Sequence, residues 1–168
     1  YGVVMKPHIA KAIEDPFTRQ KELTTPKESY RIDLKPENVE IIKKAMVEVN
    51  KSGTSASSFR NAPFVAGGKT GTAEKPGAGG YSRHVNVSTF AAVFPMDAPR
   101  YVVVAMLDAP KGTADTFGFT TAAWTAAPVV ANVISRTGPM LGVFPDPSKD
   151  MQLDDLRTLI WKEKEGAE

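Results

Sequence analysis

The sequence predicts an α+β domain in which helices flank an antiparallel sheet. Two segments, 85–94 and 100–107, have the composition of strands, and only the turn at 95–99 separates them. A turn this short can join only antiparallel neighbours. Apolar residues recur at helical spacing within 35–50 and again after Pro128, which supplies the flanking helices.

Composition limits what the protein can bind. The 168 residues are 42% hydrophobic and 24% charged, which is ordinary for one globular domain with a core. A net charge of +2 is too small to indicate nucleic acid as a partner. There is no cysteine, and His8 and His84 lack the spacing of metal ligands. We therefore expect no metal and no other cofactor.

We divide the chain into a domain portion, 1–150, and a C-terminal tail, 151–168, in which Met151–Trp161 has the spacing of a short helix. The first 34 residues are expected to form a strand at 8–13, a loop at 14–27 and a half-buried strand at 29–34.

The helix over 35–50 starts with Pro36, which suits the first helical position. Its apolar stripe predicts four buried residues: Val39, Ile42, Met46 and Val49. Further on, the almost continuous apolar run 100–107 predicts a central strand covered on both faces. Pro128 should start or kink a helix within 118–136. The residues expected to be buried there are Trp124, Val129, Val130, Val133 and Ile134.

The stretch that carries chemistry is Val65–Ala73, with the sequence Val-Ala-Gly-Gly-Lys-Thr-Gly-Thr-Ala. Gly68 and Gly71 remove side chains on either side of Lys69, so another backbone or a ligand can approach closely. A lysine offers a compact positive charge with three donors, and neighbouring threonine hydroxyls can bind a carboxylate. The pattern predicts an edge strand that receives an anion.

Two known motifs fit these residues to different degrees. The phosphate-binding P-loop needs a glycine where Pro63 stands and a helix directly after the lysine, whereas Gly71 and the glycine-rich segment 76–80 follow. The K-T-G element of penicillin-recognising serine enzymes matches Lys69, Thr70 and Gly71. Three residues recur by chance, so an ordinary strand with an exposed lysine is the simpler alternative for the tripeptide alone.

Several segments together resemble the penicillin-binding proteins over roughly residues 1–137. Gly67–Ala73 is similar to their K-[ST]-G-T-A strand, and Asp97–Val103 is similar to the turn and strand that follow. Ala126–Val129 resembles the start of their last helix. Within the family, the resemblance is to class B proteins of the division-specific type (penicillin-binding protein 3, FtsI). It implies the transpeptidase fold shared with β-lactamases.

The resemblance implies a serine D,D-transpeptidase that cross-links peptidoglycan stem peptides through an acyl-enzyme during septal wall synthesis, and that binds penicillin at the same serine. Lys69 would supply positive potential, and the Thr72 N–H would form half of the oxyanion hole. Both are therefore expected to be catalytic. The expected binding strand for the D-Ala–D-Ala or β-lactam carboxylate is Lys69, Thr70, Gly71 and Thr72.

The sequence departs from the family in one important respect. The nucleophile of the family is the serine of S-x-x-K, and its second motif is S-x-N. No lysine here has a serine three residues before it, and no serine is followed two residues later by asparagine. The chain is therefore interpreted as the C-terminal part of a transpeptidase domain that is inactive by itself.

The resemblance further implies a parent anchored in the bacterial inner membrane, with this domain on the periplasmic face and cell-division proteins as partners. No run of 18 apolar residues lies in this chain, so an anchor would lie outside it. Two alternatives share the fold: the ectodomain of a β-lactam-sensing receptor, and a serine β-lactamase or D,D-carboxypeptidase.

Overall fold

The structure is a computed structural model that describes residues 2–77, 80–154 and 156. Contacts divide the chain into two compact units, Tyr1–Glu40 and Ile41–Glu168. Helix α1 (Pro36–Lys51) begins in the first unit and continues in the second. Among the described residues, no helix has both the length and the apolar character needed to cross a membrane.

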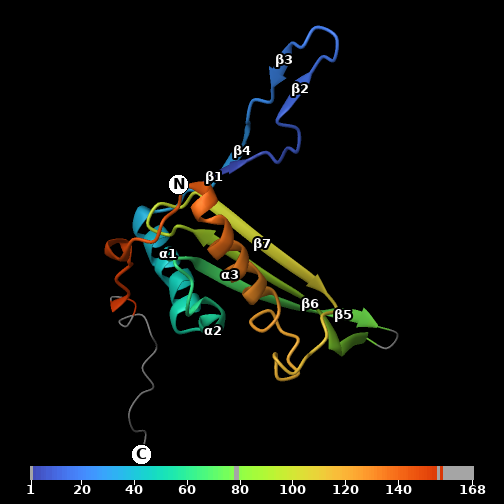
Figure 1. Ribbon diagram of the computed structural model, residues 1–168, viewed down its shortest axis with the longest axis vertical. Coiled ribbons are helices and arrows are strands. Elements are labelled where there is room, and N and C mark those ends of the chain that lie inside the picture. The colour runs from blue at the N-terminus through green and yellow to red at the C-terminus, as the bar shows by residue number, and fades with distance from the viewer. Residues whose placement is uncertain (1, 78–79, 155, 157–168) are drawn as a thin grey trace, which may run out of the picture. The chain divides into compact units, whose positions relative to one another are not determined.

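The first unit contains two small antiparallel ladders (Figure 1). Strand β1 (Val3–Met5) pairs with β4 (Glu28–Arg31), and β2 (Ala12–Glu14) pairs with β3 (Lys21–Leu23). The strand expected at 8–13 was therefore misplaced, and the loop expected at 14–27 contains β3.

A turn without glycine explains this error. The Asp15 carboxylate accepts hydrogen bonds of 2.8 Å from the N–H groups of both Phe17 and Thr18. Arg19 then adopts a φ of 60°, which lets the chain reverse into β3. Asp15-Pro16 is a turn signal, but an arginine rarely adopts a positive φ, so the sequence did not show that the chain reverses here into a second strand.

Strand β4 confirms a strand near 29–34, but the half-buried face was wrong. Tyr30 is 58% exposed and Ile32 is 45% exposed. A two-stranded ladder has no second layer within its own unit, so alternating apolar residues remain in contact with solvent.

Helix α1 confirms the prediction for 35–50, while its buried face differs from the predicted stripe. The buried residues are Val47 and Asn50, whereas Ile42 is 52% exposed. A short helix, α2 (Ala56–Phe59), follows and buries Phe59.

The second unit is built on a three-stranded sheet in which all neighbours are antiparallel, which confirms the antiparallel pair predicted for 85–94 and 100–107 (Figure 1). Its strands in spatial order are β5 (Gly67–Gly77), β6 (Gly80–Phe94) and β7 (Tyr101–Asp108). The register places Lys69 of β5 opposite Ala91 of β6, and Ala91 opposite Val104 of β7. Lys69 and Val104 therefore point to the same face of the sheet.

Strand β7 is not the doubly covered central strand that its composition predicted. On the described sheet it lies at an edge, and its burial alternates. Val102, Val104 and Met106 are 67%, 60% and 69% exposed. Apolar residues on both faces of a strand indicate that both faces tolerate burial, but they do not show that both are covered within this chain.

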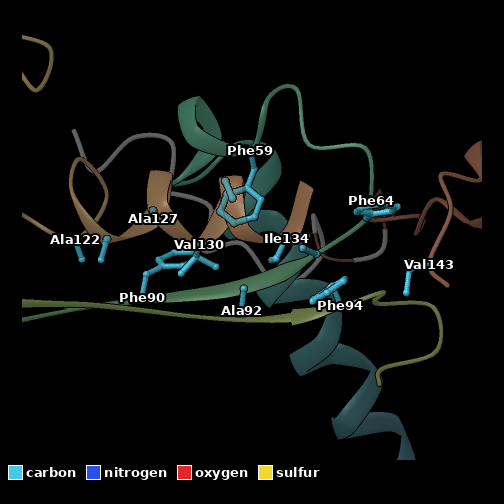
Figure 2. Packing of buried hydrophobic residues seen from close by; sticks show 13 residues of the cluster. Phe59, Phe64, Phe90, Ala92, Phe94, Ala122, Ala127, Val130, Ile134 and Val143 are labelled. Atoms are coloured by element: carbon cyan, nitrogen blue, oxygen red, sulfur yellow. The ribbon is translucent and has the colours of Figure 1, made fainter. Parts of the chain in front are cut away.

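Helix α3 (Ala126–Thr137) packs against β6 and β7 and forms the main core with them (Figure 2). Pro128 is the third residue of α3, which confirms that it lies at the start of the helix. Val130 and Ile134 are fully buried against Phe90 and Phe94.

Two residues of the stripe predicted for α3 are not buried, because Val129 and Val133 remain 43% and 38% exposed. Two 3-10 turns, η1 (Pro139–Leu141) and η2 (Pro147–Lys149), follow α3. The helix predicted at Met151–Trp161 lies mostly outside the described residues.

Candidate functional site

The two glycines around Lys69 have different roles. A Cβ at Gly68 would lie 2.4 Å from Phe90 Cζ and 2.8 Å from Asn50 Oδ1. The space beside Gly68 is therefore filled by core side chains of the protein itself and is not open to a ligand. A Cβ at Gly71 would meet nothing nearer than Thr89, at 3.7 Å, so the space beside Gly71 is open.

A buried amide holds the segment that leads into the K-T-G residues. Asn50, 6% exposed, donates from Nδ2 to the Ala66 carbonyl at 2.8 Å. The Ser55 hydroxyl donates to Asn50 Oδ1 at 2.7 Å, so both ends of the amide are satisfied. Asn50 could not be identified from the sequence because its partner lies 16 residues away. The one available signal was a polar residue at the end of an apolar helix.

The hydrogen-bond alternation of the sheet determines which backbone groups of β5 are free. The Ala109 N–H donates to the Asn86 carbonyl at 2.9 Å, so Asn86 and every second residue after it in β6 face β7. The alternate residues of β6 face β5 instead. Among them, Ala91 and Thr89 form backbone hydrogen bonds with their register partners, Lys69 and Gly71. The N–H and C=O groups of Thr70 and Thr72 therefore point away from β6, along the outer edge of β5.

The Lys69 side chain lies at this same edge. It is exposed, and its Nζ donates to the Thr70 carbonyl at 2.6 Å, which agrees with an outward-pointing carbonyl. Within the described residues, no carboxylate is within ion-pair distance of Lys69. The edge therefore combines an uncompensated ammonium with outward backbone N–H groups.

The threonine side chains lie on the opposite face of the sheet from Lys69, because side chains alternate along a strand. Thr70 is half-buried and Thr72 is exposed. A ligand that touches Lys69 and both hydroxyls must consequently lie along the strand edge and not on one face. This arrangement can bind a carboxylate or an oxyanion through charge-assisted hydrogen bonds.

Hydrogen bonds hold the loop 109–125 against β6 and β5. The fully buried Ser88 hydroxyl donates to the Thr120 carbonyl at 2.6 Å, and Asn86 Nδ2 donates to Thr120 Oγ1 at 2.8 Å. The Ala122 N–H donates to Thr72 Oγ1 at 3.2 Å. The loop is thus held beside the K-T-G strand, and the Thr72 hydroxyl keeps its own proton for a ligand.

An aromatic cluster lies on this loop. Trp124, predicted to be a core residue, is half-buried and stacks on Phe119 at a centroid distance of 5.4 Å. It also meets Phe117 edge-on at 5.5 Å. Phe117 and Phe119 are 75% and 52% exposed, so the cluster presents apolar rings to solvent on the loop that contacts Thr72.

Serines that could be mistaken for a nucleophile have structural roles. Ser55 and Ser88 are both fully buried. The Ser55 hydroxyl is engaged with Val49 and Asn50, and the Ser88 hydroxyl with Thr120.

A cavity of the second unit lies away from the K-T-G edge. It has a volume of about 630 Å³ and is bordered by the end of α1, by α2 and by residues 142–150. Its walls include Phe59, Phe64, Arg60 and Arg100, and none of residues 67–73. Within the described part of the chain, no three His, Cys, Asp or Glu side chains gather as a metal site would require.

Comparison with known proteins gives the family. The family described as the penicillin binding protein transpeptidase domain matches residues 1–134. This chain belongs to that family.

The relatives of this transpeptidase chain are named as cell-wall proteins. It is 52% identical over 83 residues to the probable peptidoglycan D,D-transpeptidase FtsI of Caulobacter vibrioides, covering 46% of this chain and 14% of that protein. It is 33% identical over 161 residues to stage V sporulation protein D of Bacillus subtilis, covering 94% and 24%. The chain therefore spans less than a quarter of the length of these relatives.

Solved structures show the same fold. Penicillin-binding protein 3 of Mycobacterium tuberculosis, complexed with ampicillin, matches with a TM-score of 0.62 and 26% identity over 87% of this chain and 33% of its own. The transpeptidase domain of Burkholderia pseudomallei penicillin-binding protein 3 matches with a TM-score of 0.59 and 27% identity, over 73% and 35%. The transpeptidase chain is thus α+β and resembles the class B, FtsI-like branch of the family.

Proposed function

We propose that this chain is the K-T-G-bearing part of a peptidoglycan D,D-transpeptidase that cross-links stem peptides in septal wall synthesis. The observation that carries the proposal is the outer edge of β5, where the Lys69 ammonium and the outward Thr72 N–H lie together. Family membership and the FtsI-like names of relatives support the reaction class.

In this proposal the substrate carboxylate of D-Ala–D-Ala, or that of a β-lactam, lies along the β5 edge. Lys69 supplies positive potential, and the hydroxyls of Thr70 and Thr72 hold the carboxylate. Gly71 leaves the strand without a side chain at the point of approach. The tetrahedral oxyanion would accept a hydrogen bond from the Thr72 N–H, a donor already fixed by the sheet.

The nucleophile in this proposal is a serine of an S-x-x-K element, which this sequence does not contain. That serine attacks the D-Ala–D-Ala carbonyl, releases D-alanine and leaves an acyl-enzyme for the acceptor amine. The chain supplies one wall of the pocket, so by itself it is expected to be inactive.

We further propose that the parent protein is membrane-anchored, acts on the periplasmic face of the inner membrane and associates with cell-division proteins. The FtsI names among relatives support a division role, and the ampicillin complex of one structural neighbour supports β-lactam binding.

The test is acylation of the parent protein by a fluorescent penicillin, with Lys69→Ala as the variant. Loss of a preorganised charge should cost about 3 kcal/mol in the transition state, or on the order of 100-fold in acylation rate. Lys75→Ala is the matched control, because Lys75 lies on the same strand but is paired with Asp108 at 2.7 Å. An acylation rate that is unchanged in Lys69→Ala would refute the assignment.

The isolated chain provides a second test. Intact-mass measurement after incubation with penicillin should show no adduct, because an unactivated serine hydroxyl is a poor nucleophile near neutral pH. A stoichiometric mass increase mapped to one serine would show that a nucleophile exists within the chain, and the interpretation as a partial domain would have to be given up.

A further inference from the structure

Two buried polar residues of β6 lie on the same face of the sheet as Thr72. Ser88 is the register partner of Thr72, and Asn86 is two residues before Ser88, so side-chain alternation places all three on one face. Ser88 is fully buried and Asn86 is 8% exposed. Ser88 Oγ lies 2.6 Å from the Thr120 carbonyl oxygen and 3.0 Å from Asn86 Oδ1, and Asn86 Nδ2 lies 2.8 Å from Thr120 Oγ1. The two residues therefore hold Thr120 by its backbone and by its side chain.

These contacts fix the peptide of Ala122, which is two residues after Thr120. Ala122 is fully buried, and its N–H donates to Thr72 Oγ1 at 3.2 Å. Its carbonyl accepts a hydrogen bond of 2.8 Å from the N–H of Ala127, in the first turn of α3. Ala122 is therefore held on its C-terminal side by a packed helix and on its N-terminal side by the buried pair of β6. Loss of that pair would free the Ala122 N–H to move relative to Thr72 while α3 stays packed.

The contact from Ala122 determines what the Thr72 hydroxyl offers to a ligand. A threonine hydroxyl has one proton to donate and two positions at which it can accept. Because the Ala122 N–H occupies one acceptor position, the proton of the hydroxyl points elsewhere, and the group is presented as a donor. A fixed donor favours an anionic acceptor over a neutral one, since charge-assisted hydrogen bonds are about twice as strong as neutral ones.

We propose that Ser88 and Asn86 are positioning residues, which act through Thr120 and Ala122 to orient the Thr72 hydroxyl and so set the preference of the site for a carboxylate. The inference rests on the proposed function, in which Thr72 holds the carboxylate of the ligand. Ser88 and Asn86 are buried beneath the loop and do not touch the ligand themselves. A pair that only stabilised the loop would change the stability of the fold without changing which ligand is preferred.

The test measures the preference of the parent protein for a carboxylate. The second-order rate constant of acylation is measured with benzylpenicillin and with its methyl ester, which carries no negative charge. Ser88→Ala should lower the rate with benzylpenicillin by roughly 10-fold and the rate with the ester much less, because only the carboxylate loses a charge-assisted hydrogen bond. Thr120→Val, which removes the acceptor of Asn86 Nδ2, should act in the same direction. Thr120→Ser keeps that acceptor and should retain the wild-type preference.

Two further variants separate positioning from a general loss of stability. Because Ser88 acts through Thr72, adding Ser88→Ala to Thr72→Val should not reduce the preference beyond that of Thr72→Val alone. Ile134→Val shortens a fully buried core side chain and should lower the unfolding temperature without changing the preference. A wild-type preference in both Ser88→Ala and Thr120→Val overturns this inference and leaves the proposed function standing. Independent losses from Ser88→Ala and Thr72→Val overturn it equally, whereas a wild-type parent that benzylpenicillin does not acylate overturns the proposed function and this inference with it.

Discussion

Each of the two units of the chain is stabilised internally by a different kind of interaction. The second unit has a packed core, in which Phe90, Phe94 and Ile134 are fully buried. No described residue before Ile41 is buried. The first unit relies on short ladders, one capped turn and exposed ion pairs such as that between Arg31 and Glu28 at 2.8 Å. Exposed ion pairs contribute little to stability, so the first unit should open at a much lower free-energy cost than the second.

This difference explains where the candidate site lies. The K-T-G edge needs donors that do not move during the reaction, and the second unit supplies a strand fixed by a packed sheet and by the Asn50 amide. Substitutions that disturb the core should therefore destroy the site and the fold together. Substitutions at the outer edge of β5 should affect ligand binding more than the stability of the fold, and those in the first unit should have local effects.

The largest effect is expected for Gly68→Ala. The added methyl group would press on Phe90 and on the Asn50 amide, both of which belong to the core. Overpacking of this kind should lower the free energy of unfolding by about 3 kcal/mol, measured by urea denaturation of the chain. Gly71→Ala is the control, because its methyl would meet only ordinary contacts, and its effect should stay within roughly 1 kcal/mol. Equal losses in the two variants would contradict the division of β5 into a packed part and an open part.

Features that depend on local sequence could be predicted, whereas features that depend on tertiary contacts could not. Strands β6 and β7 and helices α1 and α3 were found because apolar patterns and proline position are local signals, and β5 was found from its contiguous glycine, lysine and threonine motif. The sequence could not distinguish Val104 from Val103, or Val133 from Ile134, because both members of each pair are apolar and only the tertiary structure decides which one is covered.

The candidate site shows the same limit. Lys69 and its neighbours form a contiguous motif and could be identified from the sequence, with their roles still to be tested. Asn50 and the Ser88–Thr120 contact could not be identified, because each joins segments that are distant in the chain. The direction of the Thr72 N–H also required the register of the sheet.

An intermediate effect is expected for Thr72→Val, which keeps the shape and removes the hydroxyl. The variant loses the hydrogen bond from the Ala122 N–H, which should cost about 1 kcal/mol in unfolding free energy. In the parent protein it should also weaken binding of carboxylate-bearing β-lactams. Thr72→Ser restores the hydroxyl and should recover most of both losses. Binding that follows side-chain size instead of the hydroxyl would exclude a carboxylate contact here.

The smallest effect is expected in the first unit, at the Asp15 turn. The N–H groups of Thr18 and Phe17 hold the pKa of the Asp15 carboxyl below its ordinary value of 3.8. Because the folded pKa is lowered, the contribution of this turn is complete above the ordinary value and is lost as pH falls through the folded value. Between pH 5 and pH 8 the hairpin should therefore not respond to pH.

An NMR titration of the Phe17 and Thr18 amide signals measures this directly, since both protons bond the carboxylate. The two signals should move together with a midpoint below 3.8, while amides of α3 in the second unit, a helix without acidic residues, stay in place. Asp15→Asn keeps an acceptor oxygen and removes the titrating group, so the movement should disappear while the hairpin remains. A midpoint at or above the ordinary value would mean that the turn is open in solution. If the α3 amides moved in the same transition, opening of the turn would be coupled to the second unit.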